Sequence, residues 1–284
     1  MKKIYHLLPK KIRIYVYTKV HYLLQLFKYK VLSISEITGN YYCPVCEHKI
    51  KRYNSLAPFL DGKFINNIHI QETIHFPENY ETYSIDSFFC PICGAQDKAR
   101  LYAFYIKEFI INNVSNSNKV KFIHFAPETG LSFKLNNYKI LDYYTSEYNN
   151  SYADYNLDLT NMSVIPTSNF DFFICSHILE HIIDDNSAIR ELRRILKKGG
   201  KGIIMVPIML TLTDDFYDPS IISDDLRLKH FGQEDHVRVY SKTGFVNKLK
   251  NNGFNVSQLG IDFFGHETFY KLGLTNTTTL YIVD

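Results

Sequence analysis

Residues 171–207 constrain the fold of this chain more than any other segment does. An uninterrupted apolar run at residues 172–175 precedes a helix-like segment, and a second apolar run follows at residues 202–206. Runs without polar alternation are typical of strands buried on both faces of a parallel sheet. The helix-like segment has one apolar face, which would pack on that sheet. The order strand, helix, strand therefore predicts an α/β fold with a parallel sheet. The apolar face consists of Ile189, Leu192, Ile195 and Leu196.

The ends of this helix also have sequence signals. Asp184 is expected to cap the amino-terminal end, because its carboxylate can accept hydrogen bonds from backbone N–H groups that have no partner within the helix. Lys197 and Lys198 are expected in the last turn. Gly199 and Gly200 are expected to end the helix in a positive-φ conformation.

The chain has 284 residues, the size of one catalytic domain with an appendage, and a net charge of +3, which is weak evidence for any partner. Four of its five cysteines form two CPxC pairs. Such pairs are typical of metal chemistry in a reducing compartment, so we expect a cytoplasmic protein.

The first thirty residues hold eight Lys or Arg and no acidic residue. Apolar residues are interleaved with these charges, so residues 1–34 predict a basic amphipathic helix. The charges interrupt any apolar stretch, which argues against a signal peptide and a transmembrane span. This helix is expected to touch anionic lipid at the inner membrane surface or a partner protein, or else to pack on the body of the protein with its lysines in solvent.

Residues 35–97 predict a small zinc-ribbon-like module. The ligands would be Cys43, Cys46, Cys90 and Cys93, because two CxxC turns supply the four sulfur atoms of a structural zinc site. The 43 residues between the pairs exceed the usual spacing and would hold an insertion near residues 64–76. Disulfides or free thiols are the alternative.

Several motifs in the remaining sequence resemble those of one enzyme family. The segments SHILEH at residues 176–181 and LKKGGKGIIMVP at residues 196–207 look like class I S-adenosylmethionine-dependent methyltransferases of type 11. HFAPE at residues 124–128 and FGQEDHVRVY at residues 231–240 resemble a subgroup of that family. The resemblance covers residues 98–284. It implies a doubly wound, seven-stranded, Rossmann-like sheet that closes with an antiparallel strand near residues 279–283.

The resemblance also implies residues that bind S-adenosylmethionine. The loop after the first strand has one glycine where most members have several, and Glu128 in it would bind the methionine amino group. Glu147 would accept both ribose hydroxyls, with Asp142 as the competing acid. Asp158 would meet the adenine edge, or alternatively only cap its loop. The full predicted set is Ala126, Pro127, Glu128, Gly130, Glu147, Asp158, Leu159 and Ser176.

The predicted catalytic residues are His177, Asp235 and His236. His177 would act as a general base or orient the acceptor, and Asp235 or Glu234 would orient an imidazole. A salt-bridged lid is the competing interpretation of residues 231–240. His177 and His181 are four residues apart, but the zincin order of His followed directly by Glu is absent, so a metal pair is disfavoured and His181 is interpreted as structural.

Methyl transfer requires alignment of the acceptor with the methyl group and exclusion of water. We expect a small-molecule or saccharide acceptor, methylated at oxygen. A zinc-ribbon-containing RNA methyltransferase is the alternative, and RNA is disfavoured because most of the basic surplus lies in the first thirty residues. A silent methyltransferase-fold scaffold is a third interpretation.

Overall fold

The computed structural model describes residues 39–56, 75, 77–114, 119–149 and 152–284. Its main sheet has seven strands in the order β5-β4-β3-β6-β7-β9-β8. Strands β3 to β7 are parallel, whereas β9 pairs antiparallel with both β7 and β8. The predicted seven-stranded Rossmann-like sheet with an antiparallel closing strand is therefore confirmed. The strands are β3 (Val120–Phe125), β4 (Leu141–Glu147), β5 (Tyr155–Asn156), β6 (Phe170–Ser176), β7 (Leu196–Met205), β8 (Val256–Leu259) and β9 (Leu280–Val283).

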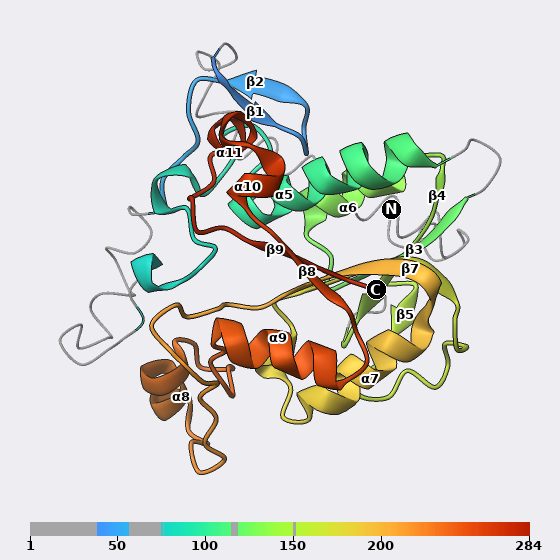
Figure 1. The fold of residues 1–284 in the computed structure, drawn as a ribbon, viewed down its shortest axis with the longest axis vertical. Helices are drawn as coiled ribbons and strands as arrows, with labels where there is room; N and C mark the ends of the chain where they lie inside the picture. Colours follow the sequence, from blue (N-terminus) through green and yellow to red (C-terminus); the bar gives the residue numbers. More distant parts are fainter. Residues whose placement is uncertain (1–38, 57–74, 76, 115–118, 150–151) are drawn as a thin grey trace, which may run out of the picture.

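Helices cover both faces of this sheet, as Figure 1 shows. Helices α5 (Asp97–Tyr105), α6 (Thr129–Asn136), α10 (Ile261–Phe264) and α11 (His266–Leu272) lie on one side, and α7 (Asp185–Ile195) and α9 (Lys242–Asn251) lie on the other. Helix α8 (Asp224–Phe231) belongs to the insertion between β7 and α9. After α5 the chain stays helical through Asn113, first as a π-helical turn at Ile106–Ile110 and then as a 3-10 turn.

The segment at residues 171–207 folds as predicted, with one correction at the end of its helix. Asp184 caps α7, since its side chain accepts a hydrogen bond from the backbone N–H of Ser187 at 3.0 Å. The helix ends at Ile195, however, so Lys197 and Lys198 belong to β7 and not to the last helical turn. Pairing of β7 with β6 starts at Leu196, and the register then shifts before Lys201. The positive φ expected of the glycines occurs at Gly199 alone.

The cysteine-bearing segment packs tightly on the part of the chain that forms the seven-stranded sheet. Strands β1 (Tyr41–Cys43) and β2 (His48–Ile50) form a hairpin. The ring of Tyr41 in this hairpin stacks on the ring of Tyr270 in α11. The fully buried Arg100 of α5 lies over the ring of Tyr53 and donates to the carbonyl oxygens of Phe88 and Leu272. One arginine thus joins the segment, α5 and the end of α11. The same hydrophobic core runs from Cys43 through the sheet to Val283.

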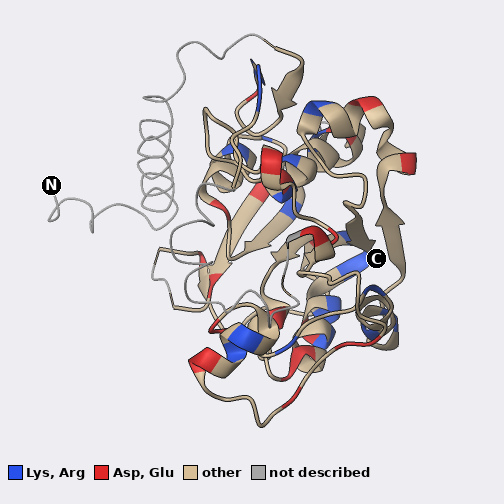
Figure 2. Cartoon of the chain, turned by 90° about the vertical axis from the view of Figure 1, so that its left-hand side faces the viewer, with Lys and Arg blue, Asp and Glu red and all other residues tan. Residues whose placement is uncertain are grey.

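The predicted boundaries at residues 34 and 97 stay predictions, and the basic segment at residues 1–34 lies outside the described residues, as does most of the predicted insertion at residues 64–76. Along the ribbon of Figure 2, positions of Lys and Arg are interspersed with positions of Asp and Glu. None of the described helices is both long enough and apolar enough to cross a membrane.

Candidate cofactor pocket and neighbouring groups

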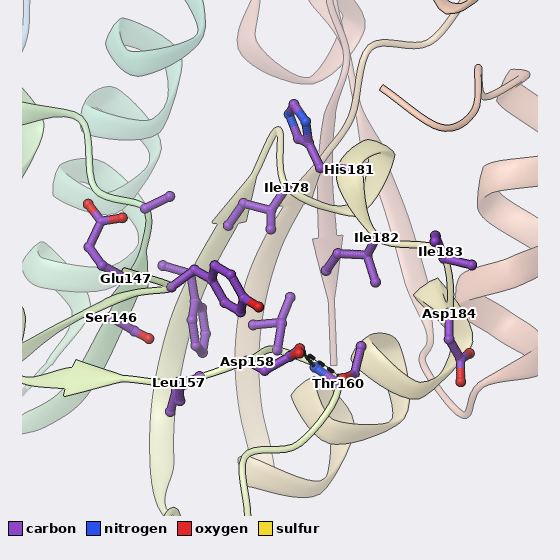
Figure 3. Close-up of a pocket in the computed structure, with 14 residues that line it drawn as sticks. Ser146, Glu147, Leu157, Asp158, Thr160, Ile178, His181, Ile182, Ile183 and Asp184 are labelled. Atoms are coloured by element: carbon purple, nitrogen blue, oxygen red, sulfur yellow. Dashed lines mark hydrogen bonds between the residues drawn. The ribbon is translucent and has the colours of Figure 1, made fainter. Parts of the chain in front are cut away.

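A pocket of about 560 Å³ opens at the carboxyl ends of β3, β4 and β6. This edge is where open α/β sheets bind ligands, and the volume is in the range of small-molecule sites. In Figure 3, Ile178 and Ile182 lie on one side of the pocket and Leu157, Asp158 and Thr160 on the other. The pocket therefore offers apolar walls for a flat ring and a few polar groups at its rim. Its remaining lining residues are Phe125, Ala126, Ser146, Glu147, Tyr148, Leu159, His181, Ile183 and Asp184.

Two strands that end near this pocket turn through strained residues. Ala126 after β3 has φ 45°, and His177 after β6 has φ 54°. Non-glycine residues seldom adopt positive φ, and such strain gathers at functional sites because packing must hold it there. Ala126 is anchored by its backbone N–H, which donates to the carbonyl of Ser146 at 2.8 Å. An alanine thus makes the positive-φ turn at the end of β3.

The two acids predicted to bind the nucleoside both line the pocket. The carboxylate of Glu147 makes no hydrogen bond or ion pair with another described residue, and burial raises its pKa. Asp158 accepts from the backbone N–H and the hydroxyl of Thr160, both at 2.8 Å. It therefore caps its loop and borders the pocket at once. Asp142, the competing acid, accepts from the Tyr144 hydroxyl at 3.0 Å and does not line the pocket.

Other predicted cofactor residues lie around the pocket and not in its wall. Pro127, Glu128 and Gly130 follow Ala126, and Gly130 is buried in α6. Glu128 lies 3.0 Å from Nε2 of the buried His124. Burial acts to raise the pKa of Glu128, but its contact with His124 outweighs this effect and the pKa is lowered. Ser176 is buried, and its hydroxyl shares a hydrogen bond with Tyr102 at 2.9 Å. Their predicted cofactor contacts stay predictions.

The two predicted catalytic histidines, His177 and His236, line a second, smaller cavity of about 90 Å³. Its other walls come from segments far apart in the sequence and include His75, Tyr80, Tyr83, Pro207 and Gly232. Burial holds the pKa of His177 well below its usual range and lowers that of His236 to about 4. Both imidazoles are therefore neutral near pH 7.

Asp235 lies next to an imidazole from another part of the chain. Asp235 or Glu234 was expected to orient an imidazole, and the carboxylate of Asp235 lies 3.2 Å from Nδ1 of His181. His236 instead places its Nδ1 3.2 Å from the carbonyl of Phe231. Consecutive residues point to different sides of a loop, so Asp235 and His236 reach different groups. His181, interpreted as structural, lines the large pocket.

A carboxylate that sequence analysis missed lies among these histidines. Glu180 is 1% exposed, and neither of its carboxylate oxygens has a hydrogen-bond partner among the described residues. His177 Nδ1 is 3.4 Å from Glu180 Oε1, without hydrogen-bond geometry. Burial raises the pKa of Glu180 to about 8. The only sequence signal for Glu180 was its position in the SHILEH motif at residues 176–181.

The four predicted metal ligands lie together. Sγ of Cys43 is 3.7 Å from Sγ of Cys93, and Sγ of Cys46 is 3.8 Å from Sγ of Cys90. Zinc–sulfur bonds of about 2.3 Å in a tetrahedron place the sulfur atoms about 3.8 Å apart, so the residues fit zinc. No disulfide joins them. Glu47 is paired with Lys134 at 2.8 Å and does not join the cluster.

One family model matches part of this chain. Residues 136–204 match the model of a family described as "Methyltransferase domain". This stretch runs from the end of α6 to β7 and includes Glu147, Asp158, His177 and Glu180. Together with the sheet, the match supports a class I S-adenosylmethionine-dependent methyltransferase. No curated protein matches the sequence.

Solved structures are similar to this chain at low identity. The CurJ carbon methyltransferase shares 12% identity with a TM-score of 0.43, over 65% of this chain and 53% of that one. The cyclase SpnF shares 11% with a TM-score of 0.42, over 65% and 80%. A SAM dependent methyltransferase from Archaeoglobus fulgidus shares 11% with a TM-score of 0.40, over 65% and 92%. The chain thus spans about half the length of the first of these, and similarity of this size says nothing about substrate.

Proposed function

We propose that the protein transfers a methyl group from S-adenosylmethionine to a small-molecule or saccharide acceptor, at oxygen. The observation that carries this proposal is the pocket at the carboxyl edge of the sheet, in which the partly buried Glu147 carboxylate has no hydrogen-bond or ion-pair partner among the described residues. An acid in this position is suited to bind two neighbouring hydroxyls, because a carboxylate accepts several hydrogen bonds. The match to a methyltransferase domain covers this acid.

The proposed roles follow from where each group lies. Glu147 would bind the ribose, Asp158 and Leu159 would meet the adenine edge, and Ile178 and Ile182 would pack on the ring. His177 borders the second cavity, which we assign to the acceptor. Its neutral imidazole can take a hydroxyl proton as the acceptor oxygen attacks the methyl carbon. The apolar walls exclude water, which would compete as nucleophile.

The cysteine cluster is proposed to hold a structural zinc ion through Cys43, Cys46, Cys90 and Cys93. Four thiolates close the tetrahedral shell, so bound zinc would have no position for substrate. Its contribution would be to fix the hairpin and the segment that carries Tyr80 and Tyr83, two residues of the acceptor cavity.

Most of the basic surplus lies in the first thirty residues, which favours a small acceptor over RNA, since an RNA-binding face needs a basic stripe along the catalytic part. An RNA methyltransferase and a silent scaffold are the alternatives that experiment must exclude. We keep a cytoplasmic location, with the basic segment at the inner membrane surface or on a partner protein, as part of the proposal.

Glu147→Ala is expected to weaken S-adenosylmethionine binding by about 10- to 100-fold, the effect of losing hydrogen bonds to one charged group. Calorimetric titration of the purified protein measures this directly. Asp142→Ala is the matched control, because Asp142 lies on the same strand and outside the pocket. Binding by neither wild type nor control would favour the scaffold, and equal binding by wild type and Glu147→Ala would reject the ribose assignment.

His177→Asn is expected to reduce turnover by about 10²-fold or more, as loss of a general base does, while the dissociation constant of S-adenosylmethionine changes little. Asparagine is chosen because it tolerates the positive φ found here. Release of S-adenosylhomocysteine, with an acceptor found by screening hydroxyl compounds and saccharides, is the measurement. Weaker cofactor binding at unchanged turnover would assign His177 a structural role.

A further inference from the structure

A second cluster of metal-binding side chains lies between the two cavities. Ligand atoms of Glu180, His181 and His236 lie within 4.8 Å of one another. Glu180 and His181 come from the turn after β6, whereas His236 comes from the insertion after β7. Only the fold brings them together. The rings of His181 and His236 meet edge to face with centroids 4.7 Å apart.

The buried carboxylate of Glu180 is an independent indication of a missing ligand. It is 1% exposed, and both its oxygens lack hydrogen-bond partners among the described residues. Burial of such a group is costly unless a charge or a hydrogen-bond donor compensates for it. A cation bound between Glu180 and the two imidazoles would supply that charge.

The two imidazoles are held as metal ligands usually are. His181 directs Nδ1 to Asp235, 3.2 Å from its carboxylate, and His236 directs Nδ1 to the carbonyl of Phe231 at 3.2 Å. Metal-bound histidines typically donate the other ring N–H to a carboxylate or a carbonyl, which leaves the lone pair on the remaining nitrogen for the metal. In both residues Nε2 is that nitrogen.

We propose that Glu180, His181 and His236 bind a divalent transition-metal ion such as Zn²⁺ or Mn²⁺, which in turn binds the hydroxyl of the methyl acceptor. Two imidazoles and one carboxylate are typical ligands of such ions and, unlike the four-cysteine shell, leave positions for substrate. Ligand bonds of about 2.1 Å bring adjacent donors to about 3.4 Å in a tetrahedron and about 3.0 Å in an octahedron, so small side-chain rotations must close the cluster. His181, whose side chain is 32% exposed, has room to rotate.

The location fits an acceptor site. His181 lines the large pocket and His236 lines the small cavity, so the ion would lie at the partition between cofactor and acceptor. A bound cation lowers the pKa of a coordinated hydroxyl. The proton passes to His177, the oxygen bonds to the methyl carbon, and the carbon–sulfur bond breaks with its electron pair on sulfur, giving S-adenosylhomocysteine. This catalytic part rests on the proposed function, whereas the cation site does not.

Measuring cation binding tests the proposed metal site without an assay of methyl transfer. With zinc in the cysteine cluster, full-length protein is expected to bind one further equivalent of Mn²⁺, measured by loss of the free-ion paramagnetic resonance signal, or of Zn²⁺, measured by elemental analysis. Glu180→Gln and His181→Asn should each weaken this binding at least tenfold. Glu180→Gln retains side-chain volume, and His181→Asn shortens a side chain that is 32% exposed, so circular dichroism should show a native fold for both. His266→Ala, at an exposed histidine on α11, is the control and should bind as wild type does.

No second equivalent of either ion in folded wild-type protein would overturn the site, and so would equal binding by both variants. Titration of S-adenosylmethionine in the same samples separates the two proposals. Cofactor binding without the second ion rejects only the cation site. A second ion without cofactor binding rejects only the methyltransferase function.

Discussion

Replacing Cys43 with serine is expected to release zinc and to lower the melting temperature by about 10 °C or more. Structural zinc contributes folding free energy directly, on the order of 10 kcal/mol in isolated zinc modules. Losing about 4 kcal/mol of this folding free energy would already lower the midpoint temperature of thermal unfolding by about 10 °C for a domain of this size. Cys43 is fully buried in the core shared with the sheet, so the effect should not stay confined to the hairpin.

Elemental analysis and thermal denaturation of the same samples check this prediction. Cys175→Ala is the matched control, because Cys175 is equally buried in β6 and lies outside the four-cysteine cluster. The control should keep its zinc. A Cys43→Ser protein with unchanged metal content would show that the four thiols do not hold a zinc ion.

Loss of zinc in the Cys43→Ser variant should also disturb the structure of the acceptor cavity. The segment between the two cysteine pairs carries Tyr80 and Tyr83, and its Glu81 is buried against Lys242 at 2.6 Å and the Tyr281 hydroxyl at 2.8 Å. These contacts connect the segment to α9 and β9. We therefore expect Cys43→Ser to impair turnover even where the sheet stays folded.

Local sequence signals predicted most of the sheet, because strand burial and helix capping depend on residues close in sequence. Asp184 and the helix that it caps are where they were expected. The error at Lys197 has a local cause. Gly199 does adopt positive φ, but it does so within an irregular strand start and not at a helix end.

Pairings between distant segments were beyond the reach of sequence patterns. Nothing local indicates that Arg100 joins Phe88 to Leu272, or that Asp235 pairs with His181. The interpretation of His181 as structural considered only the spacing to His177. The group that gives His181 metal-binding potential is His236, which lies 55 residues further along the chain and reaches it through the fold.

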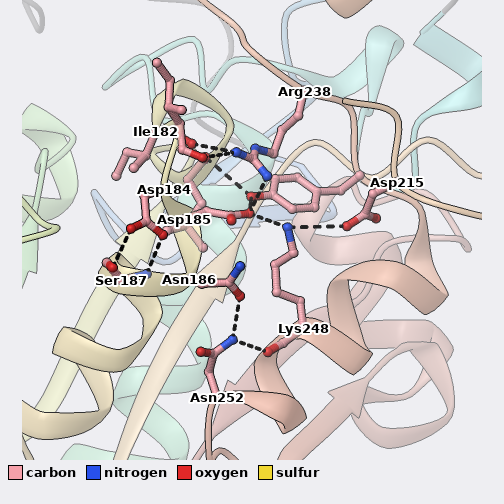
Figure 4. A network of polar contacts seen from close by, with 12 residues as sticks. Ile182, Asp184, Asp185, Asn186, Ser187, Asp215, Arg238, Lys248 and Asn252 are labelled. Carbon is pink, nitrogen blue, oxygen red and sulfur yellow. Dashed lines mark hydrogen bonds and ion pairs between the residues drawn. The ribbon is translucent and has the colours of Figure 1, made fainter. Parts of the chain in front are cut away.

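Asp185→Ala is expected to destabilise the protein by about 3–5 kcal/mol, the usual effect of removing one partner of a buried ion pair. Asp185 is 1% exposed, and its Oδ2 lies 2.9 Å from Arg238 and 2.5 Å from Lys248 and accepts from the Tyr240 hydroxyl at 2.6 Å (Figure 4). Without it, the guanidinium of Arg238, itself 5% exposed, would be left without its carboxylate partner.

This change should also weaken cofactor binding, because Arg238 holds a wall of the large pocket. Its guanidinium donates to the carbonyl oxygens of Ile182 and Ile183, at 2.9 and 2.6 Å, and both residues line that pocket. Chemical denaturation and calorimetric titration measure the two effects. The neighbouring Asp184→Ala is the control, since Asp184 is an exposed helix cap and should affect stability less. Equal stability of the two variants would show that the buried network contributes no more than the cap. Cofactor affinity equal to that of the wild-type protein would show that the wall holds its position without the contact between Asp185 and Arg238.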